Sequence, residues 1–258
     1  MNILMTIDVG NTNISLGLMQ GNEVIGSFRL TTKTPRTSDE FGLCIKELLD
    51  MTKLQEDDIE AVIISSVVPK IMYSLTSAIV KFLHKDPIIV GPGIKTGISI
   101  RTDNPREVGA DRIVDISMAY HTYHKSCIIV DFGTATTFDY ISGDGVFKYT
   151  VIAPGLGIVA NALTSQTAKL PEIEIQKPES ILNGNTITGM QAGVIYGYIG
   201  SVEYIIKQMK KELKLKDCLV IATGGLGKVI AKETKEIDLF DPDVAYKGMR
   251  ILYDLNKK

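Results

Sequence analysis

Two copies of an Asp-x-Gly sequence, each at the end of an apolar run, occur in this 258-residue chain. The first copy lies in residues 3–13 and the second in residues 127–137, near the middle of the chain. Each copy is followed by two alternating segments that flank a turn of glycine with Asn or Asp. Alternation of period two predicts strands, and these turn residues adopt the backbone conformations that tight hairpins require. Each half of the chain is therefore predicted to begin with three strands joined by hairpins.

A second pair of matching segments follows later in each half. Residues 61–70 and 219–228 are apolar strand patterns that lead into helical patterns. Longer helical patterns cover residues 38–51, 112–122, 190–213 and 246–255. The repeated plan of strands and helices predicts an α/β protein made of two related lobes. We expect an N-terminal lobe of residues 1–115 and a C-terminal lobe of residues 116–258.

The composition excludes several classes of protein. Lys and Arg number 28 against 30 Asp and Glu, so no large basic field is available for binding nucleic acid. The three cysteines, Cys44, Cys127 and Cys218, are scattered in the way typical of a reduced, intracellular protein. No signal-peptide pattern is visible, and no apolar run approaches the roughly 20 residues that span a bilayer. We therefore expect a cytoplasmic protein with neither nucleic-acid nor membrane partners.

The first Asp-x-Gly motif is suited to binding metal and phosphate together. Asp8 ends the predicted strand, and Gly10 is followed by Asn11, Thr12 and Asn13. The carboxylate would approach Mg²⁺ directly or through water, while backbone N–H groups and the Asn and Thr side chains would bind phosphate oxygens. Taken alone, the motif is equally compatible with a hairpin turn in which Asp8 is a local cap.

The second motif favours the phosphate interpretation. Asp131 and Gly133 repeat the first motif, and Thr134 is followed by two further threonines that add hydroxyl groups. Two such turns in matching halves could hold a polyphosphate from both sides. Threonine is also common in strands for structural reasons, which is the alternative interpretation of this run.

A third glycine turn ends the apolar strand of the second half. Thr223, Gly224 and Gly225 would let a ribose or a flat ring approach the backbone closely. Gly-Gly at a joint between a strand and a helix is common, so this turn is weak evidence by itself. The chain contains neither a GxxxxGK[ST] sequence nor a GxGxxG after the first strand, which argues against P-loop and dinucleotide-binding proteins.

The stretch from Gly109 to Arg112 is the strongest candidate for chemistry. Gly109 and Ala110 form a predicted turn before a helix, which places Asp111 and Arg112 at the helix start. An aspartate there could accept a proton from a hydroxyl group, and the arginine could hold a carboxylate or a phosphate. The alternative is a capping aspartate followed by a surface arginine, a pair found at many helix starts.

These motifs together resemble the type III pantothenate kinases, in that family's order and with similar spacing from residue 3 to about residue 250. The resemblance rests on the segments around Asp8, Asp111, Asp131, Gly155 and Thr223. It implies the actin-like ATPase fold, which is ribonuclease H-like, with ATP between two related lobes. It also implies ATP-dependent phosphorylation of pantothenate to 4'-phosphopantothenate, the first step of coenzyme A biosynthesis. The family is homodimeric and uses Mg²⁺ and a monovalent cation, K⁺ or NH₄⁺.

The resemblance also implies roles for individual residues. Asp111 would be the general base, Asp131 the ligand of the monovalent cation, and Asp8 a ligand of Mg²⁺ through water. Pantothenate would contact Gly109, Ala110, Asp111 and Arg112, together with Thr186 from the other subunit of the dimer. The residues that would bind ATP are Asp8, Val9, Gly10, Asn11, Thr12, Asn13, Ile14, Ser15, Thr134, Thr223, Gly224 and Gly225.

One position departs from the family pattern. Thr102 stands where many members carry an aromatic residue that packs on the substrate, which leaves the detailed shape of the pantothenate pocket open. Residues 170–185 are polar and irregular, and we expect a mobile loop that could close over substrate.

Two other functions are compatible with such a chain. One is a kinase of the same superfamily that acts on a sugar or a short acid, against which the Gly-Ala-Asp-Arg stretch argues. The other is a catalytically silent regulator that binds ligand and controls a partner. Retention of Asp8, Asp111 and Asp131 argues against the second, because a silent relative has no chemical need for all three.

Overall fold

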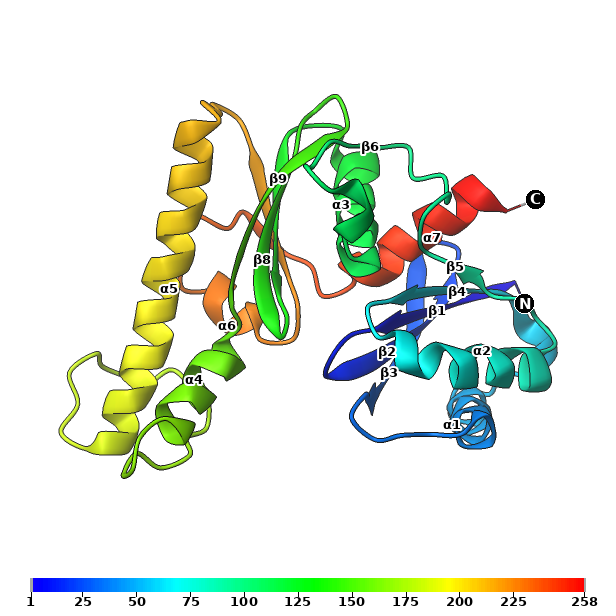
Figure 1. Cartoon of the computed structure of the whole chain (residues 1–258), viewed down its shortest axis with the longest axis horizontal. Coiled ribbons are helices and arrows are strands. Elements are labelled where there is room, and N and C mark those ends of the chain that lie inside the picture. Colours follow the sequence, from blue (N-terminus) through cyan, green and yellow to red (C-terminus); the bar gives the residue numbers. More distant parts are fainter. Residues whose placement is uncertain (1, 258) are drawn as a thin grey trace. The chain divides into compact units, whose positions relative to one another are not determined.

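The structure, a computed structural model, describes residues 2–257 and contains two β-sheets (Figure 1). The strands of the first sheet are β1 (Ile3–Val9), β2 (Asn13–Gln20), β3 (Glu23–Thr31), β4 (Ile59–Ser66) and β5 (Ile88–Ile89). Those of the second sheet are β6 (Ser99–Ile100), β7 (Cys127–Phe132), β8 (Ala135–Ile141), β9 (Val146–Pro154), β10 (Leu219–Thr223) and β11 (Leu239–Phe240).

The two sheets share one strand order. The first runs β3-β2-β1-β4-β5, and the second runs β9-β8-β7-β10-β11 with β6 added beside β9. In both sheets the first three strands are antiparallel and the next two pair in parallel. The predicted repeat is therefore confirmed, and the chain is a mixed α/β protein.

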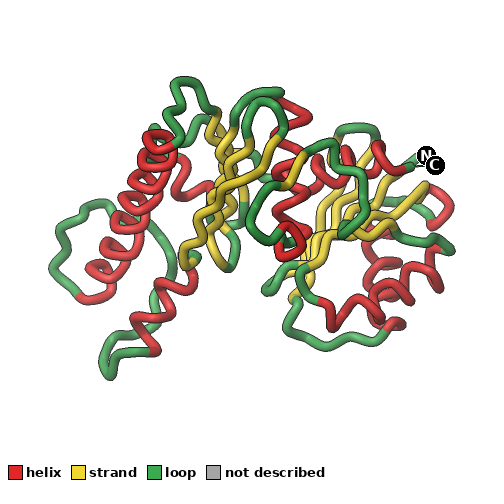
Figure 2. The backbone as a smooth tube through the Cα atoms, turned by 45° about the horizontal axis from the view of Figure 1, so that its top comes forward, coloured by secondary structure: helices red, strands yellow, loops and turns green. Residues whose placement is uncertain are grey.

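The helices occupy the segments between the strands (Figure 2). They are α1 (Ser38–Met51), α2 (Pro69–Leu83), α3 (Ala110–Tyr123), α4 (Leu156–Ser165), α5 (Thr186–Glu212), α6 (Gly227–Ala231) and α7 (Val244–Asn256), with 3₁₀ turns at Glu56–Asp58 and Pro105–Glu107. The four longer predicted helices are confirmed. Helix α5 begins four residues earlier than predicted because Asn185 caps it, accepting a hydrogen bond of 3.0 Å from the Thr188 N–H. Within residues 2–257, no helix is long and apolar enough to cross a membrane.

The chain divides into two compact units that alternate along the sequence. The first unit comprises the chain up to Ile98, Asp103–Thr122 and the chain from Asp243 onward. The second comprises Ser99–Thr102 and Tyr123–Pro242. The sequence predicts lobes of residues 1–115 and 116–258, and that division stays a prediction.

Close packing explains why α7 belongs to the first unit. The ring of Tyr246 on α7 lies 2.6 Å from where a β-carbon on Gly17 of β2 would be, so only glycine fits there. Gly248 on the same helix contacts the Val114 backbone of α3, which ties α3 to α7 as well. Contacts of this kind join segments that are remote in sequence, and the hydrophobic pattern of α7 does not reveal its partner.

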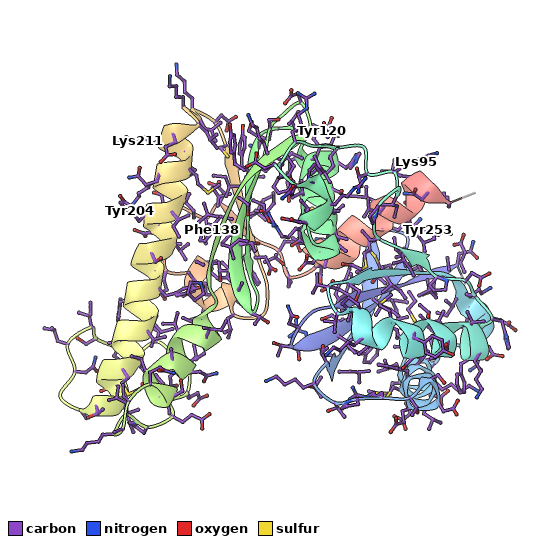
Figure 3. The ribbon with its side chains drawn as sticks, viewed as in Figure 1. Lys95, Tyr120, Phe138, Tyr204, Lys211 and Tyr253 are labelled. Atoms are coloured by element: carbon purple, nitrogen blue, oxygen red, sulfur yellow. The ribbon has the colours of Figure 1, made fainter. Side chains whose placement is uncertain are left out.

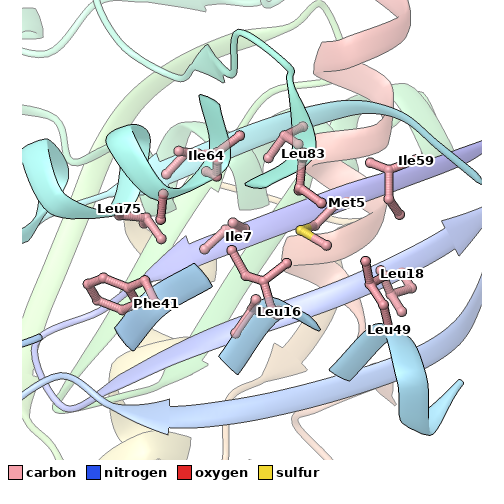
Figure 4. Packing of buried hydrophobic residues seen from close by; sticks show 14 of the residues in the cluster. Met5, Ile7, Leu16, Leu18, Phe41, Leu49, Ile59, Ile64, Leu75 and Leu83 are labelled. Atoms are coloured by element: carbon pink, nitrogen blue, oxygen red, sulfur yellow. The ribbon is translucent and has the colours of Figure 1, made fainter. Parts of the chain in front are cut away.

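The core of the first unit lies between its sheet and helices α1 and α2. Ile7, Leu16 and Ile64 of three neighbouring strands pack with Phe41 of α1 and Leu75 of α2 (Figure 4). Full burial of a side chain of this size stabilises a fold by about 1.5–3 kcal/mol. The alternate residues of β1 point to the opposite face of the sheet, and that face holds the polar groups described below.

The core of the second unit lies between its sheet and helices α4, α5 and α6. Phe138 of β8 and Val130 of β7 pack in one cluster with Ile195 and Ile199 of α5. Helix α5 runs along this face of the sheet (Figure 1) and turns other residues outward, such as the exposed Tyr204 (Figure 3). Each sheet is thus fixed by its own helices, and the turns at the strand ends rest on rigid elements.

Candidate active site

A row of polar side chains crosses the carboxyl end of β1. Asp8 pairs with Ser15 of β2 and with Ser65 of β4, and directly paired residues point to the same face of a sheet. The neighbouring Ile7 and Ile64 point into the apolar core, so the polar row lies on the other face. Ligands of open α/β sheets bind beyond the carboxyl ends of the strands, which is where this row stands.

The turn after β1 is closed by hydrogen bonds that fix its backbone. The Gly10 N–H donates to the Asn13 carbonyl over 2.9 Å, and the Thr32 N–H donates to the Thr12 carbonyl over 2.9 Å. The Thr32 hydroxyl also donates to the Gly10 carbonyl over 2.7 Å. In a trans peptide the N–H points opposite to the carbonyl, so the Asn11 N–H is directed away from Thr32. Thr32 was not among the predicted site residues, although its position just after β3 in the hairpin was a signal for it.

Asp111 lies in the first turn of α3, as predicted. Its carboxylate accepts a hydrogen bond of 2.8 Å from the Arg112 N–H and folds back over Gly109, where a β-carbon would overlap with it. The same β-carbon would lie 3.3 Å from a methyl group of Val67, which follows β4. Gly109 is therefore required for the Asp111 carboxylate to reach the end of the first sheet.

The environment of Asp8 disfavours its negative charge. Burial is the main cause that raises the pKa of Asp8 from 3.8 to about 7, and the nearby carboxylate of Asp111 raises it further. The Ser65 hydroxyl opposes this rise. That hydroxyl is fully buried and makes no hydrogen bond of normal geometry within the described chain, although it is close enough to influence Asp8. Two carboxylates held together in this way form a place where a cation is favoured.

Asp131 occupies the corresponding place in the second unit, at the end of β7. It pairs with Thr223 of β10 in the parallel register. Gly224 follows with a φ of +91°, and a β-carbon there would lie 2.6 Å from both Oδ1 of Asp131 and the Phe132 carbonyl oxygen. The Asp131 carboxylate and the Phe132 carbonyl oxygen thus both lie close to Gly224. Any other residue at this position would displace one of these two groups.

Gly155 contacts the turn after β7 and fixes its backbone. The Gly155 N–H donates to the Thr134 carbonyl over 3.1 Å, and a β-carbon on Gly155 would overlap with that carbonyl and lie 2.5 Å from the Gly133 carbonyl. Both carbonyls therefore face Gly155. Since the chain has no cis peptide bonds among the described residues, the N–H groups of Thr134 and Ala135 point the opposite way.

Most of the predicted site residues form two groups, one in each unit, and two further positions, Thr186 and Thr102, lie outside these groups. The first unit brings together the turn from Asp8 to Ser15 with the stretch from Gly109 to Arg112, and the second brings together Asp131, Thr134 and the Thr223–Gly225 turn. Thr186 begins α5 and is exposed. The Thr102 hydroxyl is buried and makes no hydrogen bond within the described residues.

The loop of residues 170–185 makes several side-chain contacts. Lys177 forms an ion pair of 2.5 Å with Glu233, and the Gln191 side chain donates to the Glu174 carbonyl over 3.0 Å. The tip is more open, and Leu182 is 84% exposed. That this loop closes over substrate stays a prediction.

Each unit thus presents an Asp-x-Gly turn at the carboxyl end of parallel strands, on sheets that share the order of five strands. This arrangement defines a protein of the actin-like ATPase and sugar kinase fold. In agreement, a protein of Sinorhizobium meliloti named as a candidate 2-dehydro-3-deoxygalactonokinase superimposes with a TM-score of 0.62 at 11% identity, covering 99% of this chain and 97% of that one.

The sequence identifies the family within this fold. Residues 4–208 match the family described as type III pantothenate kinase. The chain is 50% identical to a type III pantothenate kinase of Agathobacter rectalis, covering 97% of this chain and 96% of the relative. It is 49% identical to one of Bifidobacterium longum, covering 99% and 100%. The chain belongs to the type III pantothenate kinases.

Proposed function

We propose that this chain transfers the terminal phosphoryl group of ATP to the primary hydroxyl group of pantothenate, the first step of coenzyme A biosynthesis, in the cytoplasm. The observation that carries the proposal is the carboxylate of Asp111, folded over Gly109 beside Asp8 at the end of the first sheet. Relatives at about 50% identity that carry the name pantothenate kinase support it.

Asp111 would act as the general base. Phosphoryl transfer depends mainly on alignment and charge neutralisation, and the attacking hydroxyl must lose its proton. The Asp111 carboxylate, which is held in place by the hydrogen bond from the Arg112 N–H, would accept that proton. Arg112, the next residue, would hold the carboxylate of pantothenate through its guanidinium group.

The two turns would hold the phosphates of ATP. The N–H groups of Asn11, Thr134 and Ala135 have fixed directions, because the carbonyl of the preceding residue in each peptide group is held in place. Backbone N–H groups oriented in this way can bind phosphate without a basic surface. Thr223, Gly224 and Gly225 would receive the ribose and base.

Two cations fit the residues present. The paired carboxylates of Asp8 and Asp111 suit hydrated Mg²⁺, because a cation offsets both the burial and the repulsion by Asp111 that raise the pKa of Asp8. Asp131 and the Phe132 carbonyl supply hard oxygen ligands of the kind that K⁺ or NH₄⁺ accepts. When bound, the cations supply neutralisation of phosphate charge.

A homodimer would complete the pantothenate site with Thr186. Four glycines on α5 support an interface there, because β-carbons at Gly189, Gly193, Gly197 and Gly200 would meet no atom of the described chain within 4 Å. A second helix could approach such a face closely. Sedimentation of the full chain tests the dimer, and Thr186→Ala should raise the KM for pantothenate while leaving the KM for ATP unchanged.

The central experiment is an assay of the purified chain with ATP, Mg²⁺, K⁺ and pantothenate, together with a panel of sugars and short acids. Phosphopantothenate as the dominant product is the expected result. No phosphorylation of pantothenate, or faster phosphorylation of a sugar, would overturn the proposal. Replacing K⁺ by Na⁺ should lower the rate, and Asp131→Asn should remove the difference between the two ions.

A further inference from the structure

We propose that Tyr198 of α5 is a positioning residue for the second phosphate turn, Gly133 to Ala135. This inference rests on the proposed function, because it concerns the turn that would hold ATP. Tyr198 is 7% exposed and lies outside every motif discussed above. Its hydroxyl group and its ring contact the two sides of this turn separately.

The hydroxyl of Tyr198 forms a chain of two hydrogen bonds. It lies 2.5 Å from the Thr136 hydroxyl and donates to the Pro154 carbonyl over 3.1 Å. A phenol carries one proton and a carbonyl carries none, so the Tyr198 proton goes to Pro154 and Thr136 must donate to Tyr198. Burial raises the pKa of Tyr198, which keeps this donor protonated.

These hydrogen bonds end at residues that adjoin the phosphate turn. Thr136 follows Ala135 directly, and Ala135 pairs with Pro154 in the β8–β9 register. Pro154 precedes Gly155, whose N–H donates to the Thr134 carbonyl and whose lack of a β-carbon leaves room for the Gly133 carbonyl. A shift of the Pro154 peptide would therefore move Gly155, which contacts the turn, and would change the direction of the turn's N–H groups.

The ring of Tyr198 fixes the other side of the turn. It packs against Phe132 with ring centroids 6.3 Å apart and an angle of 50° between the planes. Phe132 follows Asp131 and precedes Gly133, and its carbonyl is the one that Gly224 approaches. The Tyr198 ring thus contacts β7, which leads into the turn. The Tyr198 hydroxyl forms hydrogen bonds with β8 and β9, which lie on the other side of the turn.

Removal of the Tyr198 hydroxyl should affect the kinetics differently if the residue positions the turn than if its role is purely structural. Tyr198→Phe keeps the ring and removes the hydroxyl, so either role lowers the melting temperature. If Tyr198 positions the turn, the variant should show a kcat about tenfold lower or a KM for ATP about tenfold higher, since small misplacements of reacting groups are costly. The KM for pantothenate should stay within about twofold, because Gly109–Arg112 belongs to the other unit.

Two further variants complete the design. Thr136→Val removes one hydrogen bond and should give a smaller change in the same direction, with less than additive effects in the double variant. Tyr140→Phe is the matched control, because its hydroxyl lies 3.4 Å from Ser126 at the opposite end of the same hairpin. The control should lose stability without a change in the KM for ATP.

Amide hydrogen exchange of residues 133–137 separates this inference from the proposed function, because it needs no substrate. Faster exchange in Tyr198→Phe than in Tyr140→Phe supports the positioning role even if pantothenate proves not to be the acceptor. Equal exchange in the two variants, or equal kinetics at equal loss of stability, would show that Tyr198 has only a structural role.

Discussion

A β-carbon on Gly224 would lie 2.6 Å from Oδ1 of Asp131, so the absence of a side chain at position 224 is what allows the carboxylate its place. The φ of +91° at Gly224 adds a second constraint, because residues with a β-carbon rarely adopt it. Both constraints act beside Asp131, the residue that would bind the monovalent cation.

Gly224→Ala should therefore impair both stability and activity. Backbone strain and overlap should lower the free energy of unfolding by about 1–3 kcal/mol. The displaced carboxylate should raise the K⁺ concentration that gives half-maximal rate. Gly157→Ala is the control, since a β-carbon there meets no neighbouring atom within 4 Å outside the backbone of its own helix. Its stability should stay the same or rise by up to about 1 kcal/mol, because Gly157 lies within α4. Normal K⁺ dependence in Gly224→Ala would contradict this account of Asp131.

Asp111→Asn should lower kcat by about 10²–10⁴-fold, the usual contribution of a general base. The amide keeps the size of the side chain, so the circular dichroism spectrum and the melting temperature should change little. Single-turnover measurements with saturating ATP would separate the chemical step from product release. Near-normal turnover would show that another group accepts the proton.

The raised pKa of Asp8 makes stability depend on pH. Because this pKa moves from 3.8 to about 7 on folding, the folded state binds more protons between these values. The contribution of Asp8 to the free energy of unfolding therefore falls as the pH rises from about 4 to about 7 and is constant above that range.

Asp8→Asn should remove this dependence. The variant should gain stability relative to the parent chain as the pH rises, by up to about 4 kcal/mol above pH 7, since one pKa unit corresponds to about 1.4 kcal/mol. Denaturant unfolding at pH 4.5 and 8.5 measures the change. Added Mg²⁺ should stabilise only the parent chain. Parallel stability curves for the two proteins would refute the assignment.

Thr32→Val should weaken ATP binding through the first turn. The change removes the 2.7 Å hydrogen bond to the part-buried Gly10 carbonyl, and the loss of a typical hydrogen bond costs about 0.5–1.5 kcal/mol. Titration calorimetry with ATP and Mg²⁺ should show a weaker affinity. Thr76→Val, which removes a 2.8 Å hydrogen bond to the Met72 carbonyl on α2, should leave that affinity unchanged.

The repeat and its motifs could be predicted because they depend on local pattern. Apolar alternation and glycine turns predicted the hairpins of both halves, and the repeated order placed Asp8 and Asp131 at equivalent strand ends. The residues that hold those turns in place could not be predicted. Thr32, Ser65 and Tyr198 act through strand register or contacts between helix and sheet, which a single sequence does not specify.

The boundary between the units illustrates the same limit. Helix α7 has a clear apolar stripe, but the stripe does not reveal which sheet it covers. Gly17, an ordinary small residue within a strand, turns out to be where the Tyr246 ring packs. A pattern that is complete within one element can be predicted, whereas a contact shared by distant elements needs the folded chain.

The packing of α7 on the first sheet also affects when the first unit can finish folding during synthesis. The ribosome makes β1 long before α7, with the whole second unit between them. Domains usually fold as they emerge, but the first unit cannot complete its packing around Tyr246 and Gly17 until the second unit has been synthesised. The newborn chain therefore carries Asp8 on an unfinished scaffold until α7 has been synthesised.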